Sequence, residues 1–353
     1  MSTDPLADLP RAHGEPLGRL LLKSVPEDFV VEEVLAFTPE GEGEHVYLEI
    51  EKRGANTAWV AGELAKRAGV APMAVSFAGL KDRHAVTRQW FSVQVPGREL
   101  DPAVFADLAG VTVRTQTRHR GKLRRGAIRA NRFELRLRPI DGAPVPEAAA
   151  VEARLATIRQ HGVPNAFGEQ RFGRSGDNVE RARKVFAGLR VRRDEYSILV
   201  SAARSDLFNQ VLAERLRRGQ WAQPLEGEVW GLDGSHSIFG PVEFDEVLRE
   251  RHARHDIHPT GPLWGAGELR SAGEVRAIEQ GVADANADLC RGLEGAGMSQ
   301  ERRSLRLIPD GLEGGVDVDG LWLRFALPAG SYATVLLREL VEAVEPARGA
   351  AAG

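Results

Sequence analysis

The chain has 353 residues, of which 42% are hydrophobic and 27% are charged, a composition that excludes an intrinsically disordered protein. A single hydrophobic core usually stops growing at about 250–300 residues, so this length predicts two domains. Residues 1–14 contain acidic residues and prolines where a signal peptide would be apolar, and no run of about 18 apolar residues follows. We therefore expect a cytoplasmic protein that does not contact a membrane.

The net charge of −3 argues against indiscriminate binding to polyanions. The charge is unevenly distributed, however, because residues 108–133 contain no Asp or Glu. The basic residues of this stretch are Arg114, Arg118, Arg120, Lys122, Arg124, Arg125, Arg129 and Arg132. A solvated loop and a surface that contacts phosphates both fit the pattern, and the interleaved Gly121 and Gly126 favour the second.

The first predicted elements are two strands and a helix. Residues 29–35 and 45–53 have the composition and alternation of strands, and the turn at Gly41–Gly43 should pair them. Apolar residues at helical spacing follow, with Asn56 or Thr57 placed to cap the start of the helix. A β-rich region with one helix is therefore predicted here.

A charged loop separates the next two extended segments, residues 75–78 and 86–95. Its sequence is Gly-Leu-Lys-Asp-Arg-His, residues 79–84. Apolar strands on either side would place Asp82 at the edge of a sheet, where the side chain could face a cleft. Residues 131–138 alternate strictly between apolar and polar side chains, which predicts a half-buried strand.

The composition changes at Gly162. A helix over residues 146–160 should end there, and residues 162–173 are rich in glycine and aromatic residues, which suits a hinge or a backbone-mediated contact. Helices are predicted over residues 177–186 and 204–217. A stretch rich in Gly, Pro and Trp then runs to residue 267.

These changes predict an inserted domain. We expect residues 162–306 to form a second domain that interrupts a first one made of residues 1–161 and 307–353. Residues 321–325 read as a strand and residues 333–344 as an amphipathic helix, and both would complete the earlier sheet.

No metal or organic cofactor is expected. The dinucleotide, phosphate-loop and serine-hydrolase motifs are absent, and the only cysteine, Cys290, reads as a buried apolar residue. His252, His255 and His258 resemble metal ligands only superficially, because positions three apart drift around a helix and the prolines and glycines that follow indicate a loop.

Asp82 could be an ordinary turn residue in a surface salt-bridge loop. Cations close to a carboxyl group lower its pKa by about 1–3 units, so Lys81 and Arg83 should keep Asp82 ionised. An ionised Asp is a competent nucleophile at an anomeric or similarly electrophilic carbon, and this chemistry requires no cofactor. The residue types alone leave both interpretations open.

Seven segments, in one order, resemble the TruD family of tRNA pseudouridine synthases over nearly the whole chain. They are residues 23–29 (KSVPEDF), 41–45 (GEGEH), 77–83 (FAGLKDR), 130–133 (ANRF), 162–173 (GVPNAFGEQRFG), 205–209 (SDLFN) and 327–332 (LPAGSY). Any one of these would be a weak signal, but the ordered set is highly specific.

The resemblance implies an α+β fold: a pseudouridine synthase-type catalytic domain with a mixed sheet, interrupted by an inserted α/β TRUD domain that forms the other wall of an RNA cleft. It implies isomerisation of a tRNA uridine, at position 13, to pseudouridine without a cofactor. Attack by an Asp on the ribose, attack on the base and formation of a glycal all remain open. We expect tRNA as the partner and a monomeric protein.

The resemblance also implies site residues. Asp82 matches the nucleophile and Lys23 its basic partner. Phe29, Asn131 and Phe133 match positions that line the uridine pocket. Lys81 and Tyr332 are expected to contact substrate, although Tyr332 stands where the family commonly has Phe. For the RNA backbone we expect contacts from Arg120, Lys122, Arg124 and Arg125.

Two other classes of function stay open. A non-catalytic RNA-binding or RNA-folding protein could use the same scaffold, but it would not need an ionised carboxylate in a pocket that accepts a flipped base. A glycoside hydrolase would need a second carboxylate across the sugar, and the spacing of the acidic residues indicates none.

Overall fold

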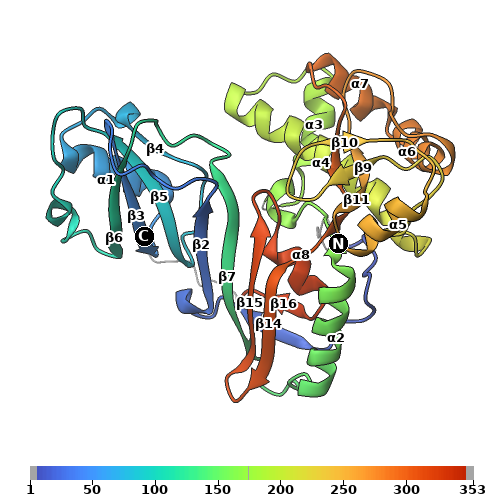
Figure 1. Ribbon diagram of the computed structural model, residues 1–353, viewed down its shortest axis with the longest axis horizontal. Coiled ribbons are helices and arrows are strands. Elements are labelled where there is room, and N and C mark those ends of the chain that lie inside the picture. Colours follow the sequence, from blue (N-terminus) through green and yellow to red (C-terminus); the bar gives the residue numbers. More distant parts are fainter. Residues whose placement is uncertain (1–5, 174, 347–353) are drawn as a thin grey trace. The chain divides into compact units, whose positions relative to one another are not determined.

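The computed structural model describes residues 6–173 and 175–346 (Figure 1). These residues form two compact units. The sheet unit contains residues 16–155, 309–330 and 340–346, and the middle unit contains residues 6–15, 156–308 and 331–339. The middle unit thus includes 6–15 and 331–339, two segments that the sequence assigned to the outer domain. Among the described helices, none is long and apolar enough to cross a membrane.

The sheet unit is built on a ten-stranded mixed sheet in the order β14-β15-β7-β2-β5-β3-β6, with β1 beside β7 and β16, and β4 beside β5. Its strands are β1 (Arg19–Leu22), β2 (Phe29–Leu35), β3 (His45–Arg53), β4 (Val75–Phe77), β5 (Val86–Gln94), β6 (Val111–His119), β7 (Ile128–Pro139), β14 (Asp310–Asp317), β15 (Gly320–Pro328) and β16 (Glu342–Val344). The pairs β1–β16 and β2–β5 are parallel and the other pairs antiparallel. The predicted α+β class with a mixed sheet is confirmed.

The predicted pairing of residues 29–35 with 45–53 is wrong, although both strands form. β5 lies between them, parallel to β2 and antiparallel to β3. The glycines of the connecting loop approach β6 instead of making a hairpin turn. The Gly41 amide donates to the Arg118 carbonyl, and a Cβ on Gly43 would lie 2.5 Å from the backbone nitrogen of Arg120.

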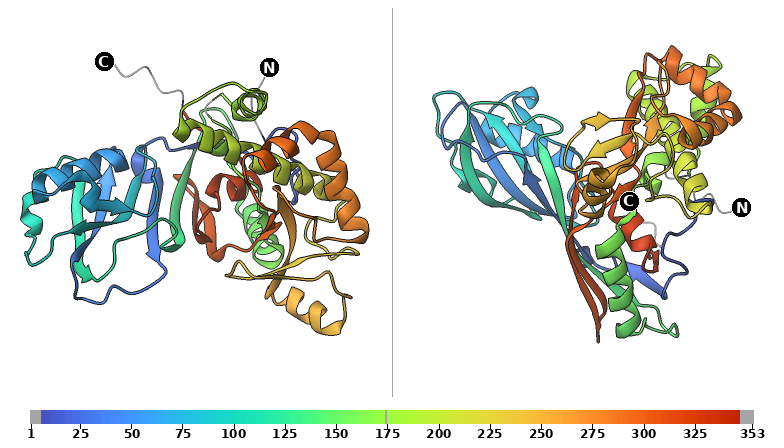
Figure 2. Two further views of the ribbon diagram at one scale, coloured as in Figure 1. Left: turned by 90° about the horizontal axis from the view of Figure 1, so that it is seen from above. Right: turned by 45° about the vertical axis from the view of Figure 1, so that its right-hand side comes forward.

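One helix, α1 (Thr57–Ala68), covers a face of this sheet (Figure 2). The predicted start is confirmed, since the Asn56 side chain accepts a hydrogen bond from the Ala58 amide. Gly69 ends the helix with φ 64°. Val60 and Leu64 are fully buried in a core that includes Phe91. Short 3-10 turns complete the unit: η1 (Pro26–Asp28), η2 (Pro72–Ala74) and η3 (Pro102–Phe105).

The middle unit combines helices with a four-stranded sheet in the order β10-β9-β11-β12 and the pair β13-β8. Its strands are β8 (Val163–Pro164), β9 (Trp230–Leu232), β10 (Ile238–Phe239), β11 (Ile257–Leu263), β12 (Glu301–Ser304) and β13 (Arg306–Leu307). Its helices are η4 (Glu169–Phe172), α3 (Asn178–Phe186), α4 (Arg193–Arg217), α5 (Glu246–Ala253), α6 (Gly273–Ala285), α7 (Ala287–Gly295) and α8 (Ala333–Arg338). The helix α2 (Ala148–His161) runs from one unit into the other.

Two helix predictions in this part needed correction. α4 begins at Arg193, eleven residues before the predicted start at 204, and extends over 25 residues. The helix predicted over 333–344 ends at Arg338, because the chain then pairs with the sheet: Glu342 lies beside Arg19 in a parallel ladder between β16 and β1. Backbone hydrogen bonds to an available strand thus replace those of a continued helix.

Candidate active site

The side chain of Asp82 lies in the loop between β4 and β5 and forms an ion pair with Lys23. One carboxylate oxygen accepts a hydrogen bond from Lys23 Nζ at 2.6 Å, and the other accepts one from the His84 amide at 2.9 Å. The Lys23 side chain is only 4% exposed, whereas that of Asp82 is 24% exposed. The cation is therefore shielded from water while the carboxylate remains accessible.

These contacts lower the pKa of Asp82. Burial is the largest single influence and would raise the pKa, but the Lys23 hydrogen bond, the His84 amide and the Lys23 charge together outweigh it. Asp82 is therefore ionised at neutral pH. The cations adjacent in sequence do not provide this effect as expected, since Lys81 pairs with Glu33 and Arg83 forms no ion pair with any described residue.

Lys23 is held in an unusual backbone conformation. Its φ of 60° lies in the left-handed region, which residues other than glycine rarely adopt. The ammonium also lies 2.9 Å from a carboxylate oxygen of Glu345 and 4.6 Å from the centre of the Phe29 ring. Backbone strain that persists at a buried, charged residue is typical of functional sites.

The turn between Lys23 and Phe29 is fixed by Asp28. The Asp28 side chain is buried, and both of its oxygens accept hydrogen bonds from the Arg138 guanidinium at 2.7–3.0 Å. Asp28 also accepts a hydrogen bond from the Val25 amide. A bidentate pair of this kind sets direction as well as distance, so it anchors the segment to β7.

Three aromatic residues, Phe29, Phe133 and Phe325, share a face of the sheet with Asn131. This face lies next to the Lys23–Asp82 ion pair. Phe133 is opposite Val31 on one side and Phe325 on the other, and Asn131 is opposite Glu33, which places these side chains on one face. The Phe133 and Phe325 rings stack at 5.2 Å, and Phe29 meets Phe133 edge-on at 6.1 Å.

Asn131 carries an unsatisfied polar atom on that face. Its side-chain oxygen is buried and accepts no hydrogen bond from the part of the chain that the structure describes. Buried polar atoms without partners are rare and costly, by about 1–3 kcal/mol. An amide in this state is ready to bind a ligand that offers complementary donors and acceptors.

A second set of charges contacts the Asp82 loop, and nothing in the sequence indicated two of its members, Glu33 and Lys52. The buried Glu33 carboxylate pairs with Lys81 Nζ at 2.7 Å and accepts a hydrogen bond from the Trp90 amide. Lys52 is fully buried and donates to the backbone carbonyls of Ala55 and Asp82. Burial raises the pKa of Glu33, although Lys81 opposes this, and burial lowers the pKa of Lys52 to about 8.

Comparisons with known proteins cover nearly the whole chain and identify one family. A family model described as tRNA pseudouridine synthase D (TruD) matches residues 15–182 and 185–340. The tRNA pseudouridine synthase D of Xanthomonas campestris pv. campestris (strain 8004) is 50% identical over 99% of this chain and 98% of that protein. The protein of the same description from Aeromonas salmonicida (strain A449) is 44% identical over 98% of this chain and 97% of its own length. The chain belongs to the TruD family.

As a TruD family member, the chain is a pseudouridine synthase, an isomerase. Its fold is also similar to a crystal structure from Methanosarcina mazei whose description names the same family. The TM-score is 0.74 and the match covers 97% of this chain and 98% of that one, at 21% identity. This TruD family member therefore shares its fold with a protein in which most of the residues differ.

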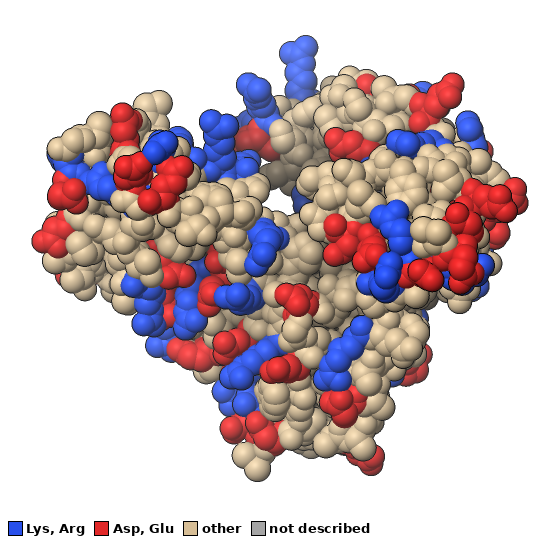
Figure 3. Space-filling model, in the orientation of Figure 1, with Lys and Arg blue, Asp and Glu red and all other residues tan. Residues whose placement is uncertain are grey.

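Half of the basic residues in this stretch of the TruD family member pair with acidic residues. Arg120 contacts Glu40 and Glu42, and the Lys122 ammonium donates to the backbone carbonyl of Met73. Arg114, Arg118 and Arg132 also pair with carboxylates, and Figure 3 shows both signs of charge intermixed over this unit. Arg124, Arg125 and Arg129 differ from these, since all three are exposed and none forms an ion pair within the described ranges.

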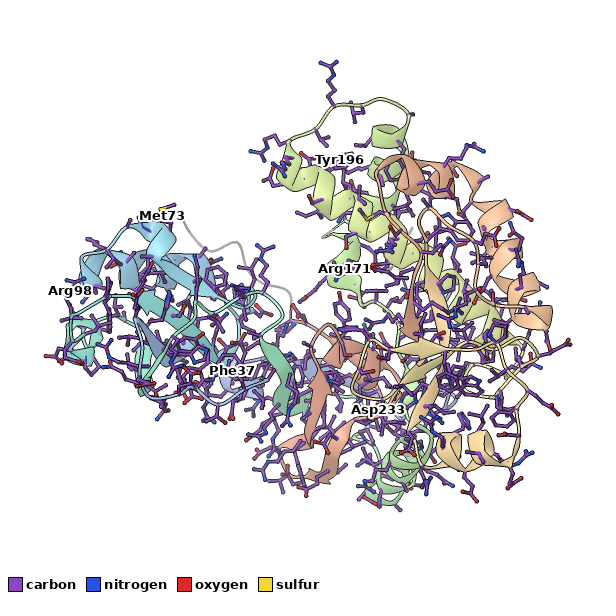
Figure 4. The ribbon with its side chains drawn as sticks, turned by 45° about the horizontal axis from the view of Figure 1, so that its top comes forward. Phe37, Met73, Arg98, Arg171, Tyr196 and Asp233 are labelled. Atoms are coloured by element: carbon purple, nitrogen blue, oxygen red, sulfur yellow. The ribbon has the colours of Figure 1, made fainter. Side chains whose placement is uncertain are left out.

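Tyr332 belongs to the middle unit, unlike the other predicted site residues. Its hydroxyl accepts a hydrogen bond from Arg171 at 3.0 Å, and its ring meets Phe167 edge-on (Figure 4 labels Arg171). Gly168 allows this packing, because a Cβ there would lie 2.9 Å from the Tyr332 ring. The Tyr332 hydroxyl therefore has a hydrogen-bond partner.

Proposed function

We propose that this chain converts a uridine of tRNA to pseudouridine, with Asp82 as the nucleophile and Lys23 as its basic partner. The observation that supports this most directly is the ion pair at 2.6 Å, in which a buried ammonium keeps an accessible carboxylate ionised. The family and its curated relatives support tRNA as the substrate. Uridine 13 is the target that the resemblance implies.

The reaction balances without a co-reactant, because it is an isomerisation. The bond from N1 of uracil to the ribose C1′ breaks, the base rotates, and a bond from C5 to C1′ forms. The proton on C5 is lost and N1 gains one. An ionised Asp82 can assist by attack on C1′, by attack on the base or by helping to form a glycal.

The aromatic face next to Lys23 fits an extruded base. Flipping a base out of folded RNA costs a few kcal/mol, and stacking on an aromatic ring returns about 1–3 kcal/mol. Phe29 and Phe133 stay predicted stacking partners, although they are only 7% and 8% exposed and an incoming base would have to uncover their rings. The unsatisfied side chain of Asn131 offers a donor and an acceptor to the edge of uracil. Lys81, which is bound to Glu33, stays a predicted substrate contact.

The test is product formation by Asp82→Asn. We expect no pseudouridine from this variant, because a neutral amide is not a nucleophile of comparable strength, while the Kd for tRNA should change by only a few fold. Purified protein is incubated with bulk unmodified tRNA, and new pseudouridines are mapped by primer extension after carbodiimide treatment.

The matched control is Asp141→Asn, an exposed carboxylate of the same unit, which should leave product formation unchanged. Turnover by Asp82→Asn above background would remove Asp82 from the nucleophile role. Binding of tRNA by the wild type without any product would instead favour the non-catalytic RNA-binding alternative.

A further inference from the structure

Lys52 is a fully buried lysine near the end of β3, directly below the Asp82 loop. Its Nζ donates hydrogen bonds to the backbone carbonyl of Ala55 at 3.0 Å and to that of Asp82 at 3.1 Å. It forms no ion pair with any residue in the described chain. Of the two residues whose carbonyls it contacts, Ala55 is apolar and Asp82 is the proposed nucleophile.

Packing does not account for a lysine at this position. Transfer of an ammonium group out of water is costly when no carboxylate contacts it, whereas an apolar side chain of similar length would fill the same space without that cost. For the same reason, burial lowers the pKa of Lys52 to about 8. The lysine must therefore act through the groups that it touches.

Those groups belong to a loop that several elements hold in place. The Thr57 hydroxyl of α1 accepts a hydrogen bond from the Lys81 amide, and Gln89 of β5 donates to the Gly79 carbonyl. Glu33 of β2 holds the Lys81 ammonium. Among these contacts, only the hydrogen bond from Lys52 is made to residue 82 itself, at its carbonyl oxygen.

We infer that Lys52 is a positioning residue, which fixes the backbone of Asp82 so that its carboxylate points at Lys23 and the substrate. The inference rests on the proposed role of Asp82. Lys52 is too deeply buried to touch a bound nucleoside, so it acts only through residue 82. A displacement of about 1 Å at a reacting group can lower a rate by about 100-fold, which sets the scale of the effect.

The experiment is a single-turnover measurement on Lys52→Met with tRNA. The rate constant should fall by about 10- to 100-fold, with the Kd for tRNA changed less than about twofold, because the loop moves but the RNA surface does not. Lys66→Met, which removes an exposed lysine of α1, is the matched control and should leave both values unchanged.

A pH profile separates positioning from a purely structural role. The groups that face Lys52 are Asp82, Glu33 and Lys81. Lys52 carries its charge below its folded pKa of about 8, so the wild-type rate should fall as the pH rises through that value. Lys52→Met has no such group and should lose this alkaline decline.

A wild-type rate in Lys52→Met would overturn the inference, and so would an equal loss of tRNA affinity. If Lys52→Met does not fold, Lys52→Gln is measured by the same criteria, since its amide keeps a donor without the charge. If neither variant folds, a wild-type rate without any alkaline decline would overturn the inference. Full activity in Lys52→Met with none in Asp82→Asn would refute this inference alone, while an inactive wild type would refute the proposed function.

Discussion

Asp82 and Lys23 depend on each other for their charge states. The ammonium is almost completely shielded from water, so without the carboxylate it would be a costly buried cation, and without the ammonium the pKa of the carboxyl group would rise under the influence of burial. The left-handed backbone of Lys23 adds strain that the surrounding structure must overcome. Lys23 and Asp82 lie 59 positions apart in sequence, yet each stabilises the charged form of the other.

The pair predicts a pH dependence. Asp82 has a lowered folded pKa, so its contribution to stability is present above the ordinary Asp pKa and is lost as the pH falls through the lowered value. The same ionisation should set the acidic limb of activity. Lys23→Met removes the main stabilising cation, so the acidic limb of the pH–rate profile should move to higher pH. An acidic limb at its wild-type position would show that another group controls it.

Site residues could be predicted from the sequence only where they matched a known motif. The pairing of Lys23 with Asp82 followed from resemblance, whereas the argument from adjacent cations misassigned Lys81, because neighbouring loop residues point in different directions. Glu33 and Lys52 gave no signal. Each is a charged residue in an alternating strand, which reads as an exposed position, and only the packed structure shows that both are buried.

The individual elements follow local rules, but their pairing does not. The bounds of β2 and β3 agree with the predicted segments, since alternation and flanking loops are properties of a few consecutive residues. Which strand lies beside which depends on residues far apart in the chain, such as Val30 and Val86. For the same reason, the sequence could not show that residues 342–344 leave the predicted helix and join β1.

The loop after β2 provides a test at the level of elements. Gly43 combines φ 120° with backbone atoms 2.5 Å from where an added Cβ would lie, whereas Gly41 has φ 85° and open space around it. Gly41→Ala should therefore cost only backbone strain, about 1 kcal/mol in the free energy of unfolding, while Gly43→Ala should cost about 2–4 kcal/mol. Denaturant unfolding of both variants measures the difference. Equal losses would show that β6 moves away freely.

At the scale of the whole molecule, ion pairs between distant residues decide the surface charge more than the net charge of any one segment does. Along the sequence, residues 108–133 form a one-sided basic region. In the structure, acidic residues from neighbouring strands and loops neutralise about half of it, for example Glu51 beside Arg114 and Glu32 beside Arg132. A count along the chain cannot detect this compensation, because the partners lie 63 and 100 residues away.

Two of the unpaired cations in this stretch, Arg124 and Arg125, predict a salt effect. Replacing Arg124 and Arg125 together by Ala should lower the slope of log Kd against log salt concentration by about one unit per lost phosphate contact. Arg120→Ala should change the slope less, since Glu40 and Glu42 already neutralise that residue. Titrations of tRNA at several salt concentrations measure both. An unchanged slope in the double variant would mean that this loop does not face RNA.

The parallel ladder between β1 and β16 has a consequence for biosynthesis. The strand that leads into Lys23 leaves the ribosome long before its partner at 342–344, and the carboxylate of Glu345 follows Lys23 by 322 residues. A nascent chain therefore cannot complete the surroundings of Lys23 until residue 345 has been added. Fragments that end before residue 342 should lack the activity, even when they contain every residue of the Asp82 loop.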